Sequence, residues 1–344
     1  MGGTSYSVDG DAFLVKFNKN GAIQWGTYYG GSSWDDGISV TTDTAGSIYI
    51  TGLTGSAGLA TSGAYMTSLP AGTAGNGNVA FIAEFSPQGS LSWATYYGGG
   101  SETSSGICID VANNLYITGT TYSQKGIATS GAYQTSIHNT NNLGLLASFL
   151  AKFSNKGALL WGTYYGGNGV DWAYTVAADN FGNVYTTGST TSTSGFATSG
   201  VYQAAYGGTP SWSNHGDAFL VKFDSSGKFK WATYYGGGDV DLGLGVATDS
   251  SGFIYVAGVT TSSGNIATKG SFQSTYGGNN SDGFLAKFNN SGGLEWGTYY
   301  GGTSIDSVTA VAVDRSNYIY ITGNTTGSPG LATSGTYQTS LKPN

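Results

Sequence analysis

A seven-residue string recurs five times along the chain and constrains its fold more than any other feature. The string reads WGTYYGG or WATYYGG, and successive copies are 65 to 70 residues apart, starting at Trp25, Trp93, Trp161, Trp231 and Trp296. A fixed period of this size is the signature of a repeat architecture, in which each repeat is one supersecondary unit. We therefore expect a fold built from five copies of one unit.

Each repeat contains four short runs rich in β-branched and aromatic residues. In the second repeat these runs are 38–43, 48–52, 80–85 and 91–97. Short turns join them, except for one long connection that ends in ATSGAY, so each repeat is predicted to be a four-stranded antiparallel meander. One meander cannot cover both of its faces, whereas sheets stacked radially cover one another. The sequence thus predicts an all-β fold, a five-bladed β-propeller that forms a single domain over residues 1–344.

The repeat also resembles a known family. The segments Ala128–Thr135 (ATSGAYQT), Asp217–Phe223 (DAFLVKF) and Val176–Thr190 (VAADNFGNVYTTGST), together with WGTYYGG, are similar to the bacterial SBBP-type β-propeller repeats. The family name implies seven blades, whereas this chain has five repeats. The resemblance implies a propeller fold and says little about activity.

The two ends of the chain predict how the propeller closes. The chain starts and ends within the same long connection, so that joining its end to its start rebuilds one repeat. By similarity to other propellers, the last blade would take its inner two strands from Val308–Gly323 and its outer two from Ala12–Tyr29. This two-plus-two strand clasp would remove the open sheet edges. The alternatives are a longer propeller that has been cut short and an open array that closes by oligomerising.

Composition excludes several classes of protein. Only 9% of the residues are charged, and the net charge of −7 comes without a basic stripe, so nucleic-acid binding is not expected. No apolar run of about 18 residues occurs, so no membrane insertion is expected. The single cysteine, Cys108, excludes a disulfide framework. Little lysine with much threonine, serine, glycine and tyrosine favours an extracellular or cell-surface protein.

A set of acidic residues follows the YYGG strings. Counting four residues past the second glycine gives Asp35, Thr103, Asp171, Asp241 and Asp306, with Glu102 beside the odd member. In a propeller these positions would ring one mouth of the central channel. Asp35, Asp171, Asp241 and Asp306 are therefore candidate ligands for calcium, which takes six to eight oxygen ligands, although no cofactor is required. The alternative is that each aspartate caps its own loop.

Three tryptophans outside the repeated string are candidate ligand-binding residues. Trp34 and Trp172 flank the acidic positions, and Trp212 lies in an insertion at 207–216. An aromatic face beside short polar side chains is a means of binding sugars. The alternative is packing within the loops.

The other recurrent residues are expected to serve the fold. The repeated tryptophan and the first tyrosine after it should pack between blades. An aspartate ends the first strand of each repeat and should cap a turn (Asp43, Asp110, Asp179, Asp249 and Asp314). A mostly basic position in the third strand is expected at the solvent-side rim or beside an aspartate (Lys16, Glu84, Lys152, Lys222 and Lys287).

No catalytic constellation is recognised. A glycoside hydrolase needs two carboxylates about 5–9.5 Å apart, and of the three glutamates only Glu102 lies near the predicted mouth. His138 and His215 have no motif around them. We therefore expect a non-enzymatic structural and interaction module, self-associating or adhesive, with other subunits or cell-surface proteins as partners. The alternatives are a lectin-like propeller that binds glycans and, third, a glycoside hydrolase.

Overall fold

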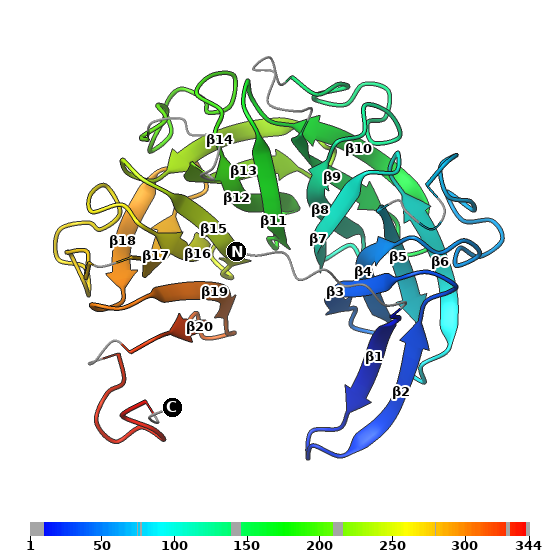
Figure 1. The fold of residues 1–344 in the computed structure, drawn as a ribbon, viewed down its shortest axis with the longest axis horizontal. Coiled ribbons are helices and arrows are strands. Elements are labelled where there is room, and N and C mark those ends of the chain that lie inside the picture. Colours follow the sequence, from blue (N-terminus) through cyan, green and yellow to red (C-terminus); the bar gives the residue numbers. More distant parts are fainter. Residues whose placement is uncertain are drawn as a thin grey trace. The chain divides into compact units, whose positions relative to one another are not determined.

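The structure is a computed structural model, and it describes residues 10–73, 75, 78–138, 146–208, 216–278, 280–327 and 331–341 (Figure 1). Within these ranges the regular secondary structure consists of β-strands, with no helix. None of the described segments is therefore a helix long and apolar enough to cross a membrane. The predicted all-β class is confirmed.

The chain divides into two compact units, which are described separately. The first comprises Met1–Ile137 and Ser148–Tyr165, and the second comprises His138–Ala147 and Gly166–Asn344. The expectation of one domain over residues 1–344 stays a prediction.

The first unit contains one two-stranded and two four-stranded antiparallel sheets. The two-stranded sheet consists of β1 (Ala12–Phe17) and β2 (Ile23–Tyr29). The four-stranded sheets have the orders β3 (Asp35–Thr42), β4 (Ile48–Thr54), β5 (Val79–Phe85), β6 (Leu91–Tyr97) and β7 (Glu102–Ile109), β8 (Leu115–Thr121), β9 (Ala147–Phe153), β10 (Leu159–Tyr165).

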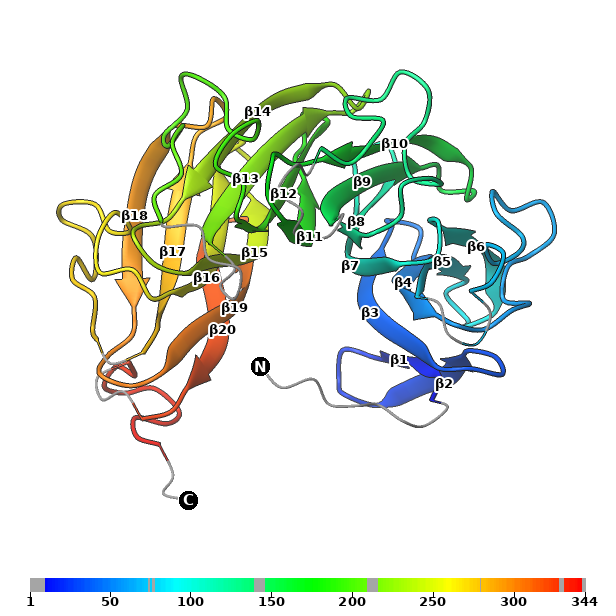
Figure 2. The same ribbon diagram turned by 45° about the horizontal axis from the view of Figure 1, so that its top comes forward.

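The second unit also contains two four-stranded sheets and one two-stranded sheet. The four-stranded sheets have the orders β11 (Asp171–Ala178), β12 (Asn183–Thr190), β13 (Asp217–Asp224), β14 (Phe229–Tyr235) and β15 (Asp241–Thr248), β16 (Ile254–Thr260), β17 (Asp282–Phe288), β18 (Leu294–Tyr300). The two-stranded sheet is β19 (Asp306–Val313) with β20 (Ile319–Thr325). Figure 2 shows the three sheets of this unit side by side. Their first strands are in contact, β11 with β15 and β15 with β19.

A β-bulge recurs between the first two strands of each sheet and explains the glycine of the second strand. In the sheet of β15 and β16, the register shifts between Gly243 and Gly245. The backbone there comes so close to Gly258 that a Cβ on this residue would lie 1.8 Å from the carbonyl oxygen of Leu242. Only glycine fits where another backbone approaches this closely.

Aromatic side chains of successive repeats pack between the sheets. In the second unit the Tyr235 ring lies 5.2 Å from that of Phe284 and 5.6 Å from that of Phe288. Equivalent contacts in the first unit join Tyr97 to Phe149 and Phe153. Aromatic pairs at these separations contribute about 0.5–1.5 kcal/mol beyond their area burial.

The repeated tryptophan covers the turn of the following sheet. The Trp93 indole Nε1 donates a hydrogen bond to the Asn155 carbonyl at 3.1 Å, and a Cβ on Gly157 would lie 2.7 Å from this indole. Trp231 makes the same contact with the Asn290 carbonyl at 3.0 Å. The expectation that these tryptophans pack between sheets is therefore confirmed.

The two-stranded sheets β1–β2 and β19–β20, called the half-sheets below, differ from the complete sheets in exposure. Phe13 is 71% and Tyr28 is 79% exposed, whereas the equivalent Phe219 and Tyr234 in a complete sheet are 0% and 1% exposed. The four complete sheets confirm the predicted meander, and no closed fifth sheet is present among the described strands. The two-plus-two clasp and the count of five blades stay predictions.

Candidate functional site

An acidic residue begins the first strand of every repeat and is buried. These residues, called the loop carboxylates, are Asp35, Glu102, Asp171, Asp241 and Asp306, each 5% exposed or less. Each stands opposite a threonine at the end of the second strand, as Asp241 does opposite Thr260. The loop carboxylates therefore occupy one equivalent place in each repeat.

The loop carboxylate ties the YYGG loop to the end of the second strand. Asp241 accepts hydrogen bonds from the Gly237 amide at 2.9 Å, the Thr260 hydroxyl at 2.5 Å and the Ser262 hydroxyl at 2.9 Å. Asp171 accepts the same three types of bond from Gly167, Thr190 and Ser192, and Asp35 accepts them from Gly31, Thr54 and Ser56. Hydrogen bonds to charged groups contribute about 1.5–3 kcal/mol each, so these carboxylates hold the loop.

Glu102, rather than Thr103, is the member of this set in the third repeat, which corrects the count made from the sequence. Three residues separate Gly98 from Glu102 in this loop, whereas four separate Gly30 from Asp35. The loop is one residue shorter, and the glutamate side chain is one methylene longer. Glu102 consequently reaches the amides of its own loop and also the Thr121 hydroxyl.

Burial changes the acidity of two loop carboxylates. Burial raises the pKa of Asp171 to about 7, although hydrogen bonds from Thr190, Gly167 and Ser192 oppose the rise. It likewise raises the pKa of Asp241 to about 6. These groups are therefore costly to ionise, because burial penalises the charged form.

The predicted metal site depends on acidic groups that lie near one another. No group of three or more His, Cys, Asp or Glu side chains in the described ranges could hold a metal ion. Asp35, Asp171 and Asp241 each use their oxygens within their own loop and the adjacent strand end. Calcium bound by Asp35, Asp171, Asp241 and Asp306 at a channel mouth stays a prediction.

The candidate aromatic residues are only partly placed. Trp34 is half-buried just before β3, and its Nε1 would lie 3.5 Å from a Cβ on Gly55. Trp172 is half-buried in β11, opposite Ser189. Trp212 and His215 lie outside the described residues. Trp34 and Trp172 belong to different units, so they are treated as separate positions.

Two recurrent polar positions have structural roles. The aspartates that end the first strands cap turns as predicted, since Asp179 Oδ1 accepts hydrogen bonds from the amides of Phe181 and Asn183, both at 2.8 Å. The basic position of the third strand is less exposed than expected. Lys152 is 6% exposed and lies 3.5 Å from Asp110, which confirms the alternative of a neighbouring aspartate and overturns the solvent-side rim at this position. Lys222 is 7% exposed and donates to Asn290.

The sequence reasoning missed a second set of buried carboxylates. Asp217 and Asp282 begin the third strands β13 and β17, and both are 0% exposed. Each accepts hydrogen bonds from a glutamine of the long connection and from a glycine amide. The signal was present, since a glutamine and a Tyr-Gly-Gly string precede each of them in the long connection, at Gln203 and Gln273.

Comparison with known proteins identifies the repeat. The model described as "SBBP: Beta-propeller repeat" matches residues 160–196, 230–265 and 295–330. Over 207 residues the chain is 25% identical to an uncharacterized WD repeat-containing protein of Acanthamoeba polyphaga mimivirus, an alignment that covers 54% of this chain and 15% of that protein.

Among solved structures, a protein of unknown function from Dyadobacter fermentans matches with a TM-score of 0.44 and 8% identity, covering 83% of this chain and 73% of that one. A mutant apocarotenoid oxygenase from Synechocystis matches with a TM-score of 0.34 and 11% identity, covering 84% of this chain and 60% of that one.

Proposed function

Because the chain contains SBBP β-propeller repeats, we propose that it is a secreted or cell-surface structural and interaction module whose half-sheets pair, β20 with β1, to complete a fifth blade. The similarity to a WD repeat-containing protein supports an interaction role. The proposal assigns no catalytic activity. The observation that carries it is the exposure of apolar side chains on the half-sheets.

The complete sheets define the register of the proposed pairing. In β16 and β17, Gly258 stands opposite Phe284 and Tyr255 opposite Lys287. The equivalent register places Gly323 of β20 opposite Phe13 of β1, and Tyr320 opposite Lys16. Tyr320 is 57% exposed in its half-sheet, whereas the equivalent Tyr255 is 2% exposed. Pairing in this register would thus give Tyr320 the surroundings of its counterpart.

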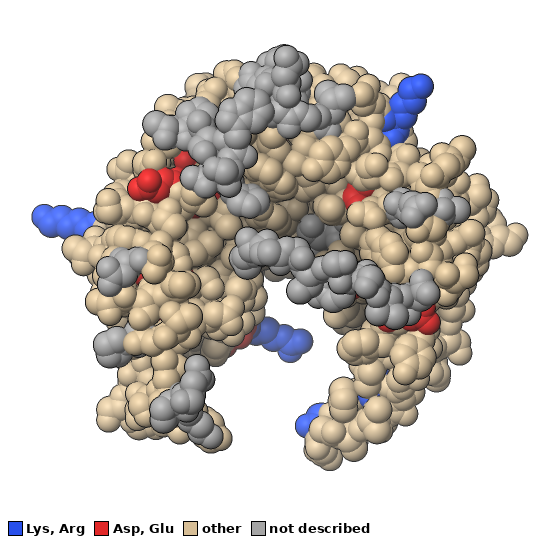
Figure 3. Space-filling view, in the orientation of Figure 1, with Lys and Arg blue, Asp and Glu red and all other residues tan. Residues whose placement is uncertain are grey.

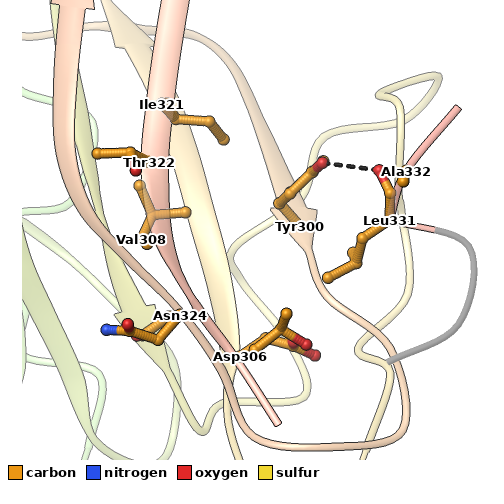
Figure 4. Close-up of a pocket in the computed structure, with 11 residues that line it drawn as sticks. Tyr300, Asp306, Val308, Ile321, Thr322, Asn324, Leu331 and Ala332 are labelled. Atoms are coloured by element: carbon orange, nitrogen blue, oxygen red, sulfur yellow. Dashed lines mark hydrogen bonds between the residues drawn. The ribbon is translucent and has the colours of Figure 1, made fainter. Parts of the chain in front are cut away.

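A cavity in the second unit lies beside β20, where the proposed pairing would place β1. It has a volume of about 340 Å³ and is lined by Tyr300, Val308, Ile321 and Leu331 among others (Figure 4). The Tyr300 hydroxyl donates to the Leu331 carbonyl at 3.0 Å, as Tyr235 does to Ile266 in a complete sheet. Tyr235 also packs against two phenylalanines of the next sheet. By equivalence, Tyr300 would pack against Phe13 and Phe17.

A second cavity extends this surface and would receive the β1–β2 turn. Its volume is about 620 Å³, and Phe272, Trp296 and Leu285 line it. In complete sheets the indole donates to the carbonyl two residues before the turn glycine. Trp296 is therefore expected to donate to the Lys19 carbonyl and to cover Gly21. Phe272 is 79% exposed, whereas the equivalent Tyr202, which contacts Phe288 of the next sheet, is 40% exposed.

The low charge of the surface supports an association role. Figure 3 shows lysine, arginine, aspartate and glutamate only at scattered positions on the face in view. With 9% charged residues, the chain meets little electrostatic repulsion when apolar surfaces approach. The same strand pairing can occur within one chain, as a clasp, or between two copies, as self-association.

Engineered disulfides test the pairing and its register. We expect a disulfide between Ala12→Cys and Asn324→Cys, which are opposite in the proposed register, in a Cys108→Ser background. A cross-linked monomer on non-reducing gels indicates the clasp, and a cross-linked dimer indicates self-association. The control pair Val15→Cys with Asn324→Cys is out of register and should cross-link poorly. Equal cross-linking of the two pairs, or none in either, contradicts the proposal.

Carbohydrate binding is the second candidate function. It is favoured by the half-buried Trp34, whose indole nitrogen lies close to the Ser33 side chain beside Gly55. Trp172 is half-buried in β11, directly after the loop carboxylate Asp171 of another repeat. A glycan array in which Trp34→Ala or Trp172→Ala abolishes binding would support this candidate. An array without binding to the parent chain would discard it.

A further inference from the structure

At two places in the second unit, a second buried carboxylate accompanies a loop carboxylate. Asp217 begins β13, and Asp241 follows the hairpin β13–β14. Asp282 and Asp306 have the same relation to β17 and β18. All four residues are 2% exposed or less. Each of these two sites, called the carboxylate pairs, therefore holds two acidic groups out of solvent.

A shared glycine shows how closely the first pair converges. A Cβ on Gly236 would lie 2.5 Å from Asp241 Oδ2 and 3.1 Å from Asp217 Oδ1. In the second pair, a Cβ on Gly301 would lie 2.6 Å from Asp282 Oδ1. In the first pair oxygens of both side chains thus lie over the glycine of the YYGG loop, and in the second pair an oxygen of Asp282 does so.

One oxygen of each third-strand aspartate points into its pair without a partner. Asp217 Oδ2 accepts hydrogen bonds from Gln203 Nε2 at 3.0 Å and from the Gly207 amide at 2.8 Å. Asp282 Oδ2 accepts equivalent bonds from Gln273 and Gly277. Oδ1 of Asp217 and Oδ1 of Asp282 are buried with no hydrogen-bond partner among the described residues. The same omission in two independent repeats indicates a missing ligand, because buried polar atoms are rarely left unpaired.

The ion pairs among the described residues leave out the two aspartates of the first pair. The ion pairs found there join Lys152 to Asp110 and Lys230 to Asp224, so neither involves Asp217, Asp241 or Asp282. Asp241 Oδ2 and Asp217 Oδ1 lie 2.5 and 3.1 Å from a Cβ built on Gly236, so two buried carboxylates face the same small space, where a positive charge would offset their repulsion.

We propose that each carboxylate pair binds a divalent cation of the calcium type, held by Oδ1 of the third-strand aspartate and by the loop carboxylate. Carboxylate oxygens are the ligands that a hard cation prefers, and backbone carbonyl oxygens or water complete its shell. One site lies at Asp217 and Asp241, and the other at Asp282 and Asp306. These sites differ from a single calcium site at a channel mouth. Each of them is formed by an aspartate of one sheet and the loop carboxylate that begins the next sheet.

The other repeats provide internal controls. In two other repeats Val79 and Ala147 occupy the place of Asp217, so that the loop carboxylates that follow them, Glu102 and Asp171, have no second acid at that position. Asp11 restores the pair with Asp35, since a Cβ on Gly30 would lie 2.4 Å from Asp11 Oδ1 and 2.7 Å from Asp35 Oδ2. Cation binding is therefore expected at Asp11 as well, and not at Val79 or Ala147.

Calcium titration of the full chain tests the inference. After EDTA treatment and dialysis, calorimetric titration with CaCl₂ should show two to three sites per chain, and added CaCl₂ should raise the thermal unfolding temperature. The double variant Asp217→Asn with Asp282→Asn should lose two of these sites. Asp224→Asn is the matched control, because it lies at the other end of β13 and should leave the number of sites unchanged.

A lanthanide probe keeps the inference testable if the double variant fails to fold. Tyr206 lies beside both acids of the first pair, since the charges of Asp217 and Asp241 add to the burial that raises its pKa to about 12. Tb³⁺ bound there by the parent chain should luminesce on tyrosine excitation, and CaCl₂ should quench the signal. If the parent chain shows neither calcium binding nor this luminescence, the pairs share a proton instead and the inference is overturned, whatever the outcome for the half-sheets.

Discussion

At the scale of single residues, the few charges of this chain are placed where burial makes them matter. Lys152 and Asp110 form an ion pair whose side chains are 8% and 3% exposed. Although burial opposes it, hydrogen bonds from Asn114 and the Lys152 charge lower the pKa of Asp110. Removing one partner of such a pair leaves a buried charge without compensation, which typically costs about 3–5 kcal/mol.

Lys152→Met is therefore expected to destabilise the chain by about 3 kcal/mol at neutral pH, measured by urea unfolding. Because the folded-state pKa of Asp110 is lowered, the pair stabilises the fold above the ordinary aspartate pKa of about 4 and loses this effect as the pH falls further. The difference between variant and parent should thus shrink below about pH 4. Lys230→Met, which breaks a pair 41% and 28% exposed, should cost less than about 1 kcal/mol.

Glu102 provides a second prediction at this scale. Glu102→Asp shortens the side chain in the loop that is already one residue shorter, so its carboxylate cannot reach all the amides of Gly99, Gly100 and Ser101. We expect a loss of about 1–3 kcal/mol in the free energy of unfolding, the typical cost of leaving buried donors unsatisfied. Glu295→Asp, at an exposed hydrogen bond to Asn289, should be nearly neutral in the same measurement.

At the scale of elements, the hairpin turn between the third and fourth strands is shaped by the tryptophan of the preceding repeat. Gly157 has a φ of +78°, a conformation that costs other residues about 1–2 kcal/mol, and the Trp93 indole lies over it. The strand meander and the turn positions could be predicted because alternation and turn residues act locally. For the indole, the sequence predicted packing between repeats. It did not predict which residues the indole contacts, since these lie in another repeat.

Gly157→Ala should therefore be destabilising for two reasons, the strained φ and the collision with Trp93. Gly131 has nearly the same φ of +77° but open space around it. Gly131→Ala thus isolates the backbone cost and is expected to lower the free energy of unfolding by about 1 kcal/mol. Gly157→Ala should cost at least about 1 kcal/mol more, given typical overpacking penalties. Equal costs in thermal unfolding would mean that the indole moves aside freely.

The site was less predictable than the strands, for reasons visible in particular residues. Counting a fixed number of residues from YYGG selected Thr103 instead of Glu102. The count could not show that the loop of Glu102 is one residue shorter and that its side chain is longer. Asp217 and Asp282 were missed because Val79 and Ala147 stand at this position in two other repeats, so the acid is not common to all five. The burial of Lys152 depends on Asp110, which is distant in sequence. Residues that differ between repeats thus form the candidate sites, and a pattern common to all repeats does not reveal them.

At the scale of the whole molecule, the exposure of the half-sheets makes a measurable prediction. Phe219→Ala removes a ring that is 0% exposed and should cost about 3–5 kcal/mol. If β20 pairs with β1, Phe13→Ala should cost a similar amount, although Phe13 is 71% exposed in its half-sheet. Urea unfolding of both variants decides the matter. A cost within about 0.5 kcal/mol of zero for Phe13→Ala, typical of a surface position, would argue that the half-sheets stay apart.

The indole contact between repeats also gives the chain a polarity. Three of the tryptophans reach forward to the turn of the following sheet: Trp25 to Gly89, Trp93 to Gly157 and Trp231 to Gly292. Gly21, in the first turn, has nothing within 4 Å of a Cβ built on it, while Trp296 stands in the last complete sheet. One end of the chain thus has a turn glycine that no tryptophan covers, and the other end has a tryptophan that could cover it. Copies that associate through this contact line up head to tail, and they form a closed ring where the rotation closes or a directional filament where it does not, unless each chain pairs its own two ends first.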